Sequence, residues 1–182
     1  MALRATIYKV EIEVSDLDRS HFQTASLALA RHPSETEERL MVRLLAWALH
    51  ADERLAFGRG ISSDDEATIW LHDLAGNMAL WVEVGLPDER VLRRACGRAG
   101  QVVLYTYGGR TAAQWWERNA ASFERLDNLS VIEIPQTASL AMTRLAARNL
   151  RVQATVQDGL VWLTLGEETL SIEPLVRLRA SR

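Results

Sequence analysis

The chain has 182 residues, 48% of them hydrophobic, and a net charge of −3. This length fits a single domain over residues 1–182, and the charge lacks the basic excess that usually accompanies nucleic-acid binding. The only cysteine, Cys96, excludes an intramolecular disulfide and a paired-cysteine zinc site and favours a reducing, cytoplasmic location. The charged N-terminal segment and the lack of a long apolar run predict neither a signal peptide nor a membrane span.

The N-terminal segment has the alternation of a β-hairpin. Residues 6–14 place Tyr8, Val10, Ile12 and Val14 on one face, which predicts a half-buried strand. The polar run 15–20 reads as a turn, and residues 21–31 are predicted to be the second strand. A helix over residues 21–31 is the alternative.

The first helix is predicted to follow Pro33. Ser34 and Glu37 have the spacing of a capping box, so the helix is expected to start at Ser34 and to run to about His50. Glu38 lies on or beside its apolar stripe, where a carboxylate is out of place. The stripe consists of Met41, Leu44, Leu45 and Ala48.

The next elements carry a second group of acids. Residues 67–73 and 78–86 flank a Gly-Asn turn and are predicted to form an antiparallel strand pair. Asp64, Asp65 and Glu66 precede the first strand, and Glu83 lies inside the second. Burying an unpaired carboxylate costs several kcal/mol, so Glu83 is expected to have a partner.

The rest of the chain alternates helices and strands. An arginine-rich helix is expected over 87–99, a strand over 101–108, a helix over 111–125, a strand over 129–135 and a helix over 137–149. Three alternating runs, RVQATV, LVWLTL and TLSIEPLV, are predicted to close the chain as an antiparallel meander. Residues 78–107 predict a right-handed parallel crossover. The fold class is therefore α/β, with a mixed central sheet and flanking helices.

These acids suggest a metal site. Mg²⁺ prefers a few hard oxygen ligands and keeps several waters, and metal-dependent phosphodiester cleavage uses two or three carboxylates at the end of a sheet. Asp65 and Glu83 are predicted on neighbouring strands and are the candidate Mg²⁺ ligands. The structural alternative is equally open: Glu38 and Glu83 pair with arginines such as Arg90 or Arg93, and the acids at 64–66 form a solvated turn.

Several segments also carry a family resemblance over nearly the whole chain. They include ATIYK, LARHPSETEERLMVRLLAWAL, GISSDDE, LWVEVGLPDERVLRRAC and VQATVQDGLVWL, with ARHPSE and GLPDER the most specific. They resemble the YaeQ family of bacterial proteins. The resemblance implies a variant of the restriction-endonuclease-like PD-(D/E)XK nuclease fold, with an added N-terminal β-hairpin and C-terminal antiparallel strands.

The resemblance also implies roles for individual residues. The helix acid falls on Glu38, the PD aspartate on Asp65 with Asp64 beside it, and the (D/E) acid on Glu83. The motif lysine is missing, because Gly85 stands two residues after Glu83 and the chain's only lysine is Lys9. Some members of the superfamily place this cation on the following helix, which would make Arg93 or Arg94 the substitute. Arginine can hold a phosphate but cannot act as a base near neutral pH.

Three functional interpretations follow. In the first, the chain is a Mg²⁺-dependent nuclease or phosphodiesterase whose site consists of Glu38, Asp65, Glu83, Arg93 and Arg94. In the second, it is a catalytically degenerate fold that binds nucleic acid or protein in transcription-related work. In the third, it is a structural fold whose acids are paired by arginines. A degenerate module would bind nucleic acid through its arginines in a salt-sensitive way without cleavage. The sequence leaves the substrate and the oligomeric state open.

Overall fold

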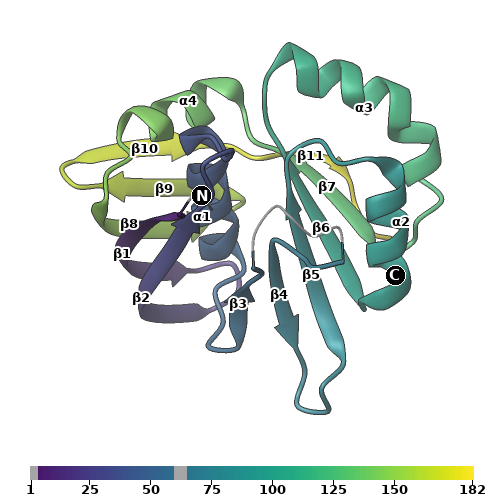
Figure 1. Ribbon diagram of the computed structural model, residues 1–182, viewed down its shortest axis with the longest axis horizontal. Coiled ribbons are helices and arrows are strands. Elements are labelled where there is room, and N and C mark those ends of the chain that lie inside the picture. Colours follow the sequence, from purple (N-terminus) through teal and green to yellow (C-terminus); the bar gives the residue numbers. More distant parts are fainter. Residues whose placement is uncertain (1–3, 60–64) are drawn as a thin grey trace. The chain divides into compact units, whose positions relative to one another are not determined.

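The computed structural model describes residues 4–59 and 65–182 and confirms an α/β chain (Figure 1). The strands in these residues form two mixed sheets, with the orders β10-β9-β8-β1-β2 and β11-β7-β6-β5-β4-β3. The contacts divide the chain into a first unit, Met1–Glu53 with Thr137–Pro174, and a second unit, Arg54–Gln136 with Leu175–Arg182. The single domain over 1–182 stays a prediction.

The first sheet is built on the predicted N-terminal hairpin. β1 (Thr6–Asp16) and β2 (His21–Arg31) pair antiparallel along their whole length, so the strand assignment for residues 21–31 is confirmed over the helical alternative. β8 (Asn149–Gln157) lies parallel to β1, and β9 (Leu160–Leu165) and β10 (Glu168–Ile172) continue the sheet antiparallel. The predicted mixed sheet with flanking helices corresponds to the second sheet, and the hairpin pairs with β8 to β10 in a sheet of its own, which the sequence did not reveal.

The helix after the hairpin, α1 (Glu37–Leu49), starts later than predicted. Its N-cap is Thr36, whose side chain accepts a hydrogen bond from the Arg39 backbone N–H at 3.1 Å, while the Ser34 hydroxyl contacts His32 Nδ1 at 2.7 Å. All residues from Leu40 to Ala48 are buried, so α1 supplies much of this unit's core. The other helix of the unit is α4 (Gln136–Arg144), apart from its first residue.

The second sheet contains the predicted strand pair around the Gly-Asn turn. β4 (Ile69–His72) and β5 (Met78–Val84) are antiparallel, and β3 (Leu55–Phe57) flanks β4. β6 (Gln101–Thr106) and β7 (Leu129–Glu133) follow parallel to β5, with α2 (Glu89–Arg98) and α3 (Arg110–Phe123) as the connections. The parallel arrangement of β5 and β6 is as predicted.

The last predicted strand is two strands in two different sheets. TLSIEPLV contributes the end of β10 to the first sheet and the start of β11 (Leu175–Leu178) to the second, where β11 pairs antiparallel with β7. Pro174 lies between them, and proline has no backbone N–H to donate to a ladder. The meander prediction therefore holds for β8, β9 and β10 and is wrong for the final strand.

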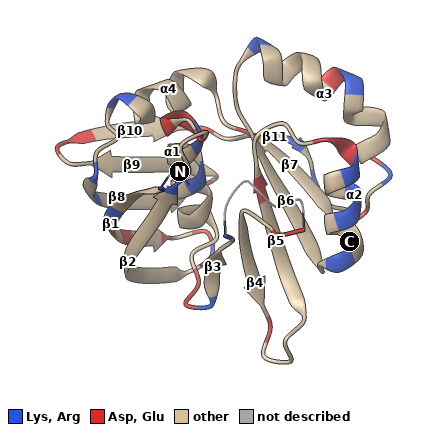
Figure 2. Ribbon diagram, in the orientation of Figure 1, with Lys and Arg blue, Asp and Glu red and all other residues tan. Residues whose placement is uncertain are grey.

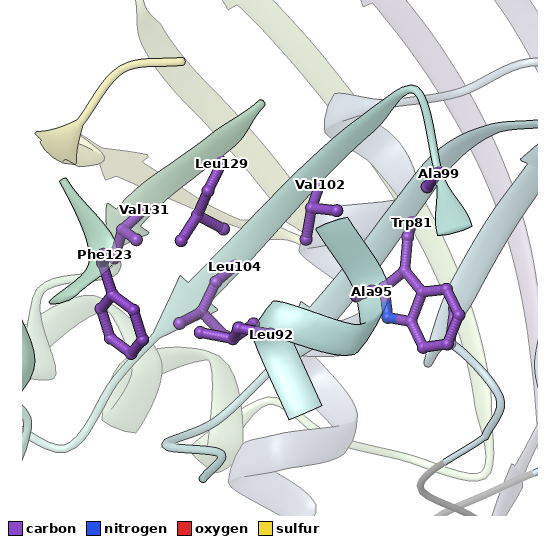
Figure 3. Close-up of a cluster of buried hydrophobic side chains, with 10 residues drawn as sticks. Trp81, Leu92, Ala95, Ala99, Val102, Leu104, Phe123, Leu129 and Val131 are labelled. Carbon is purple, nitrogen blue, oxygen red and sulfur yellow. The ribbon is translucent and has the colours of Figure 1, made fainter. Parts of the chain in front are cut away.

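The core of the second unit lies where α2 and α3 pack on β5, β6 and β7 (Figure 3). Trp81 is completely buried among Leu92, Ala95 and Ala99, so the indole fixes the position of α2 on the sheet. This arrangement matters for the candidate site because Glu83 follows Trp81 on the same strand face. In the described residues, no helix is both long and apolar enough to cross a membrane.

Candidate functional site

Glu83 has the partners that its place in a strand requires. Its Oε1 accepts a hydrogen bond from Trp81 Nε1 at 2.8 Å, and its Oε2 accepts one from Thr68 Oγ1 at 2.9 Å. Residues two apart on a strand share a face, so Trp81 lies next to Glu83 by geometry alone. Two side chains thus fix the orientation of the carboxylate.

Asp65 precedes β4 and is tied to α2. Its Oδ1 lies 2.9 Å from Arg94 Nη1 and 3.6 Å from Arg98 Nη1, and Arg98 also donates to the Asp65 carbonyl oxygen at 3.3 Å. The carboxylate remains two-thirds exposed. Asp65 and Thr68 belong to one short segment, so this segment contacts both α2 and Glu83. Asp64 lies outside the described residues.

The two substitute cations differ in their surroundings. Arg94 pairs with Asp65, whereas Arg93 pairs with Glu89 one turn earlier on α2. Figure 2 shows the basic residues along this helix. Arg98 joins Arg94 at Asp65 and was not predicted as a site residue, although its spacing of four from Arg94 places both on one helix face.

A hollow of about 590 Å³ lies beside the start of α2 and the middle of α3. Its lining includes Glu89, Arg93, Trp115 and Asn119. Arg93 therefore belongs to a polar surface depression rather than to the Asp65 pair. Of the described residues, no three His, Cys, Asp or Glu side chains gather as metal ligands.

Glu38 belongs to the first unit, whereas Asp65, Glu83, Arg93 and Arg94 belong to the second. Its side chain is partly buried on α1, and Oε1 accepts a hydrogen bond from the Ser139 hydroxyl of α4 at 2.8 Å. The Ser139 hydroxyl, a neutral donor, thus explains how Glu38 is accommodated on the apolar side of α1. The structural alternative in the sequence analysis had named an arginine as this partner.

One buried carboxylate of the first unit is a residue that the sequence analysis missed. Glu35 is 4% exposed and pairs with Arg39 at 2.7 Å and with Arg43 at 3.1 Å. Burial lowers the pKa of Arg43, and the charge of Glu35 opposes that shift. The spacing of Glu35, Arg39 and Arg43 by four residues is the signal that could have revealed this cluster. We assign the cluster a structural role.

Comparison with known proteins places the chain among close relatives. The family model described as YaeQ protein matches residues 1–174. The uncharacterized protein YaeQ of Escherichia coli (strain K12) is 48% identical over 172 residues, which cover 94% of this chain and 95% of the relative. Its counterpart in Salmonella typhi is 46% identical over 173 residues, 95% and 96% of the two chains.

Solved structures agree with this assignment. The crystal structure of the YaeQ protein from Xanthomonas axonopodis pv. citri has a TM-score of 0.91 and 44% identity and covers 95% of this chain and 98% of its own. The YaeQ protein from Pseudomonas syringae matches with a TM-score of 0.91, 32% identity and 98% coverage of both chains. The family model, the relatives and the structures together show that the chain belongs to the YaeQ family.

Proposed function

We propose that the chain is a Mg²⁺-dependent phosphodiesterase that acts on nucleic acid, with an altered PD-(D/E)XK site in its second unit. The observation that carries the proposal is the Glu83 carboxylate, which Trp81 and Thr68 hold at both oxygens beside the segment of Asp65. Neighbouring hydrogen bonds of this kind orient a carboxylate for coordination of a metal ion.

The donor set suits Mg²⁺. Two carboxylates provide hard oxygens, and the exposure of Asp65 leaves room for the waters that this ion retains. When bound, Mg²⁺ would lower the pKa of a coordinated water and polarise the phosphate. Asp65 and Glu83, both in the second unit, would hold it.

The positive charge comes from α2. Arg94 lies against Asp65 and is the better placed substitute for the motif lysine, and Arg93 lines the neighbouring hollow, where it can hold a second phosphate. Arginine remains protonated at neutral pH, so its contribution is to stabilise negative charge as the phosphodiester bond breaks.

One observation favours a second candidate function. Arg94 and Arg98 already neutralise Asp65, and the lysine of the motif is absent. Such a site can bind a nucleic-acid backbone through its arginines without cleaving it. That reading keeps the nuclease-like scaffold as a binding module for nucleic acid or protein.

Calorimetric titration of Mg²⁺ and Mn²⁺, with cleavage assays on single- and double-stranded DNA and RNA, tests the proposal. Wild type is expected to bind metal and to cleave, and the double variant Asp65→Asn/Glu83→Gln to do neither. Glu168→Gln, which removes an exposed carboxylate in the first unit, is the matched control and should behave as wild type.

The two candidate functions separate in the same experiments. Salt-sensitive nucleic-acid binding that is lost in Arg94→Ala, with no cleavage under any metal, would favour the binding module. Wild type that binds neither metal nor nucleic acid would overturn the phosphodiesterase and the nucleic-acid binding module.

A further inference from the structure

β2 is the edge strand of the first sheet, and its outward backbone groups can be identified. Lys9 N donates to the Arg148 carbonyl at 2.8 Å, so Lys9 directs its backbone groups toward β8 and away from β2. The residue opposite Lys9 on β2 is Ala28. In an antiparallel pair, two opposite residues either exchange both hydrogen bonds or exchange none. Ala28 therefore points its N–H and C=O outward, as does every second residue of β2.

The outward set is Phe22, Thr24, Ser26, Ala28 and Ala30. One independent contact agrees with this assignment, since Arg43 Nη2 donates to the Ala30 carbonyl at 2.9 Å. From Phe22 to Ala28, no hydrogen bond from any described residue reaches the outward groups. The free edge is thus a run of seven residues that ends where Arg43 covers Ala30.

This edge lacks the features by which proteins normally prevent strand pairing. The β1–β2 register runs without a bulge, and residues 22–28 contain no proline, no lysine and no charged side chain. Long, flat, uncharged edges are templates for another strand. All residues from His21 to Ala28 are at least partly exposed, so neither face of this stretch is closed off.

We propose that β2 pairs antiparallel with β2 of a second copy of this chain and joins two five-stranded sheets across a two-fold axis. The run Phe22–Ala28 has its midpoint at Ala25, which places the axis there. Thr24 then lies opposite Ser26 of the other copy, and Phe22 lies opposite Ala28.

This register suits the side chains. Phe22 is 63% exposed and would cover the small Ala28 of the second copy, and a cross-strand pair of this kind is favourable. The four opposed pairs would exchange about eight backbone hydrogen bonds. The run Phe22–Ala28 carries no charged side chain, so opposed residues of the two copies do not repel each other, as a two-fold interface requires.

Sedimentation velocity of the full chain over a wide concentration range tests the proposal. Wild type is expected to show a monomer–dimer equilibrium. Thr24→Pro removes an outward N–H in each copy but no bond of the β1–β2 ladder, and should raise the dissociation constant about tenfold or more. Thr24→Val keeps the N–H and is the control. A monomer at every concentration, or an unchanged dissociation constant in Thr24→Pro, would overturn the proposal.

A charged variant covers the case in which Thr24→Pro fails to fold. Thr24→Lys brings two ammonium groups close to the two-fold axis, so the dimer should dissociate at low salt and re-form in part at high salt. Circular dichroism checks that the strand content is retained. A folded Thr24→Lys variant that dimerises as tightly as wild type at low salt counts against pairing through β2.

Discussion

At the scale of single residues, the charge cluster around Glu35 makes the stability of the first unit sensitive to the loss of one partner. Arg43 is 4% exposed and also donates to the Ala30 carbonyl, so it connects α1 to β2. Its guanidinium is buried beside a carboxylate that is itself buried. Removal of one partner leaves the other charge uncompensated away from water.

Glu35→Ala is therefore expected to lower the free energy of unfolding by about 3 kcal/mol, as breaking a buried ion pair does. Urea denaturation measures the change. Glu89→Ala removes an exposed ion pair with Arg93 and should cost less than about 1 kcal/mol. Equal losses in the two variants would contradict a special role for Glu35.

His50, at the end of α1, makes stability depend on pH. Burial and the nearby charge of Arg19 lower its pKa from the usual 6.5 to about 4. The unfolded chain then binds the proton more readily than the folded chain, so the stabilisation is full above pH 6.5 and is lost as the pH falls toward 4. The expected slope in that window is at most about 1.4 kcal/mol per pH unit.

Urea midpoints measured between pH 4 and pH 7 test this expectation. His50→Gln should flatten the profile of the wild type in that window, and His32→Gln, at an exposed position, should leave it unchanged. A wild-type profile that His50→Gln does not alter would show that other groups set the pH dependence.

At the scale of elements, the start of α1 shows that a sequence pattern can locate a helix without fixing its first residue. Ser34 and Thr36 are both good N-cap residues, and the Glu37 that made Ser34 attractive is instead the first helical residue. The Ser34 hydroxyl contacts His32, which leaves Thr36 as the N-cap. The contact of Ser34 with His32 depends on how the chain turns after β2. Thr36→Ala should cost about 1 kcal/mol of unfolding free energy, as the loss of a cap does.

Thermal or urea unfolding measures the loss in Thr36→Ala. Thr36→Ser retains the accepting hydroxyl and should restore most of it. Ser34→Ala is expected to cost clearly less than Thr36→Ala, and the reverse order would mean that the helix begins at Ser34 after all.

The strands were predictable where a single face is buried. The alternation of β1, β8 and β9 gave their positions, because the side-chain period is fixed by the pleat, and the Gly-Asn turn gave β4 and β5. Alternation does not say which strands pair, and so the separate sheet formed by hairpin and tail was missed. The alternation also continues across Pro174, so the break between β10 and β11 is marked only by the backbone N–H that proline lacks.

The candidate site was predictable to a similar extent. The sequence indicated that Glu83 needs a partner, and the partner Trp81 follows from strand geometry, whereas Thr68 depends on the register of β4 against β5. The pairing of Asp65 with Arg94 depends on the position of α2 on the sheet, which is set by the buried cluster that includes Trp81 and Leu92.

At the scale of the whole molecule, the expected single domain can be tested by cooperativity. Tryptophan fluorescence and far-UV circular dichroism should report one coincident urea transition. Phe123→Ala empties a fully buried position in the second unit, and should shift both signals together by about 3–5 kcal/mol.

Leu74→Ala, at a position that is 95% exposed, is the control and should leave both transitions in place. If Phe123→Ala splits the unfolding curve into one transition that shifts and one that stays at the wild-type urea concentration, the two units unfold independently.

The parallel pairing of β1 with β8 has a consequence for synthesis on the ribosome. Lys9 and its partner Asn149 are 140 residues apart, so at 5–20 residues per second the first strand waits about 7 to 28 s for its neighbour. During that interval β1 has only β2 beside it in its sheet, and its apolar face cannot be completed. The nascent hairpin therefore exposes its apolar face for longer than β3 to β7, which emerge from the ribosome in the order in which they pair.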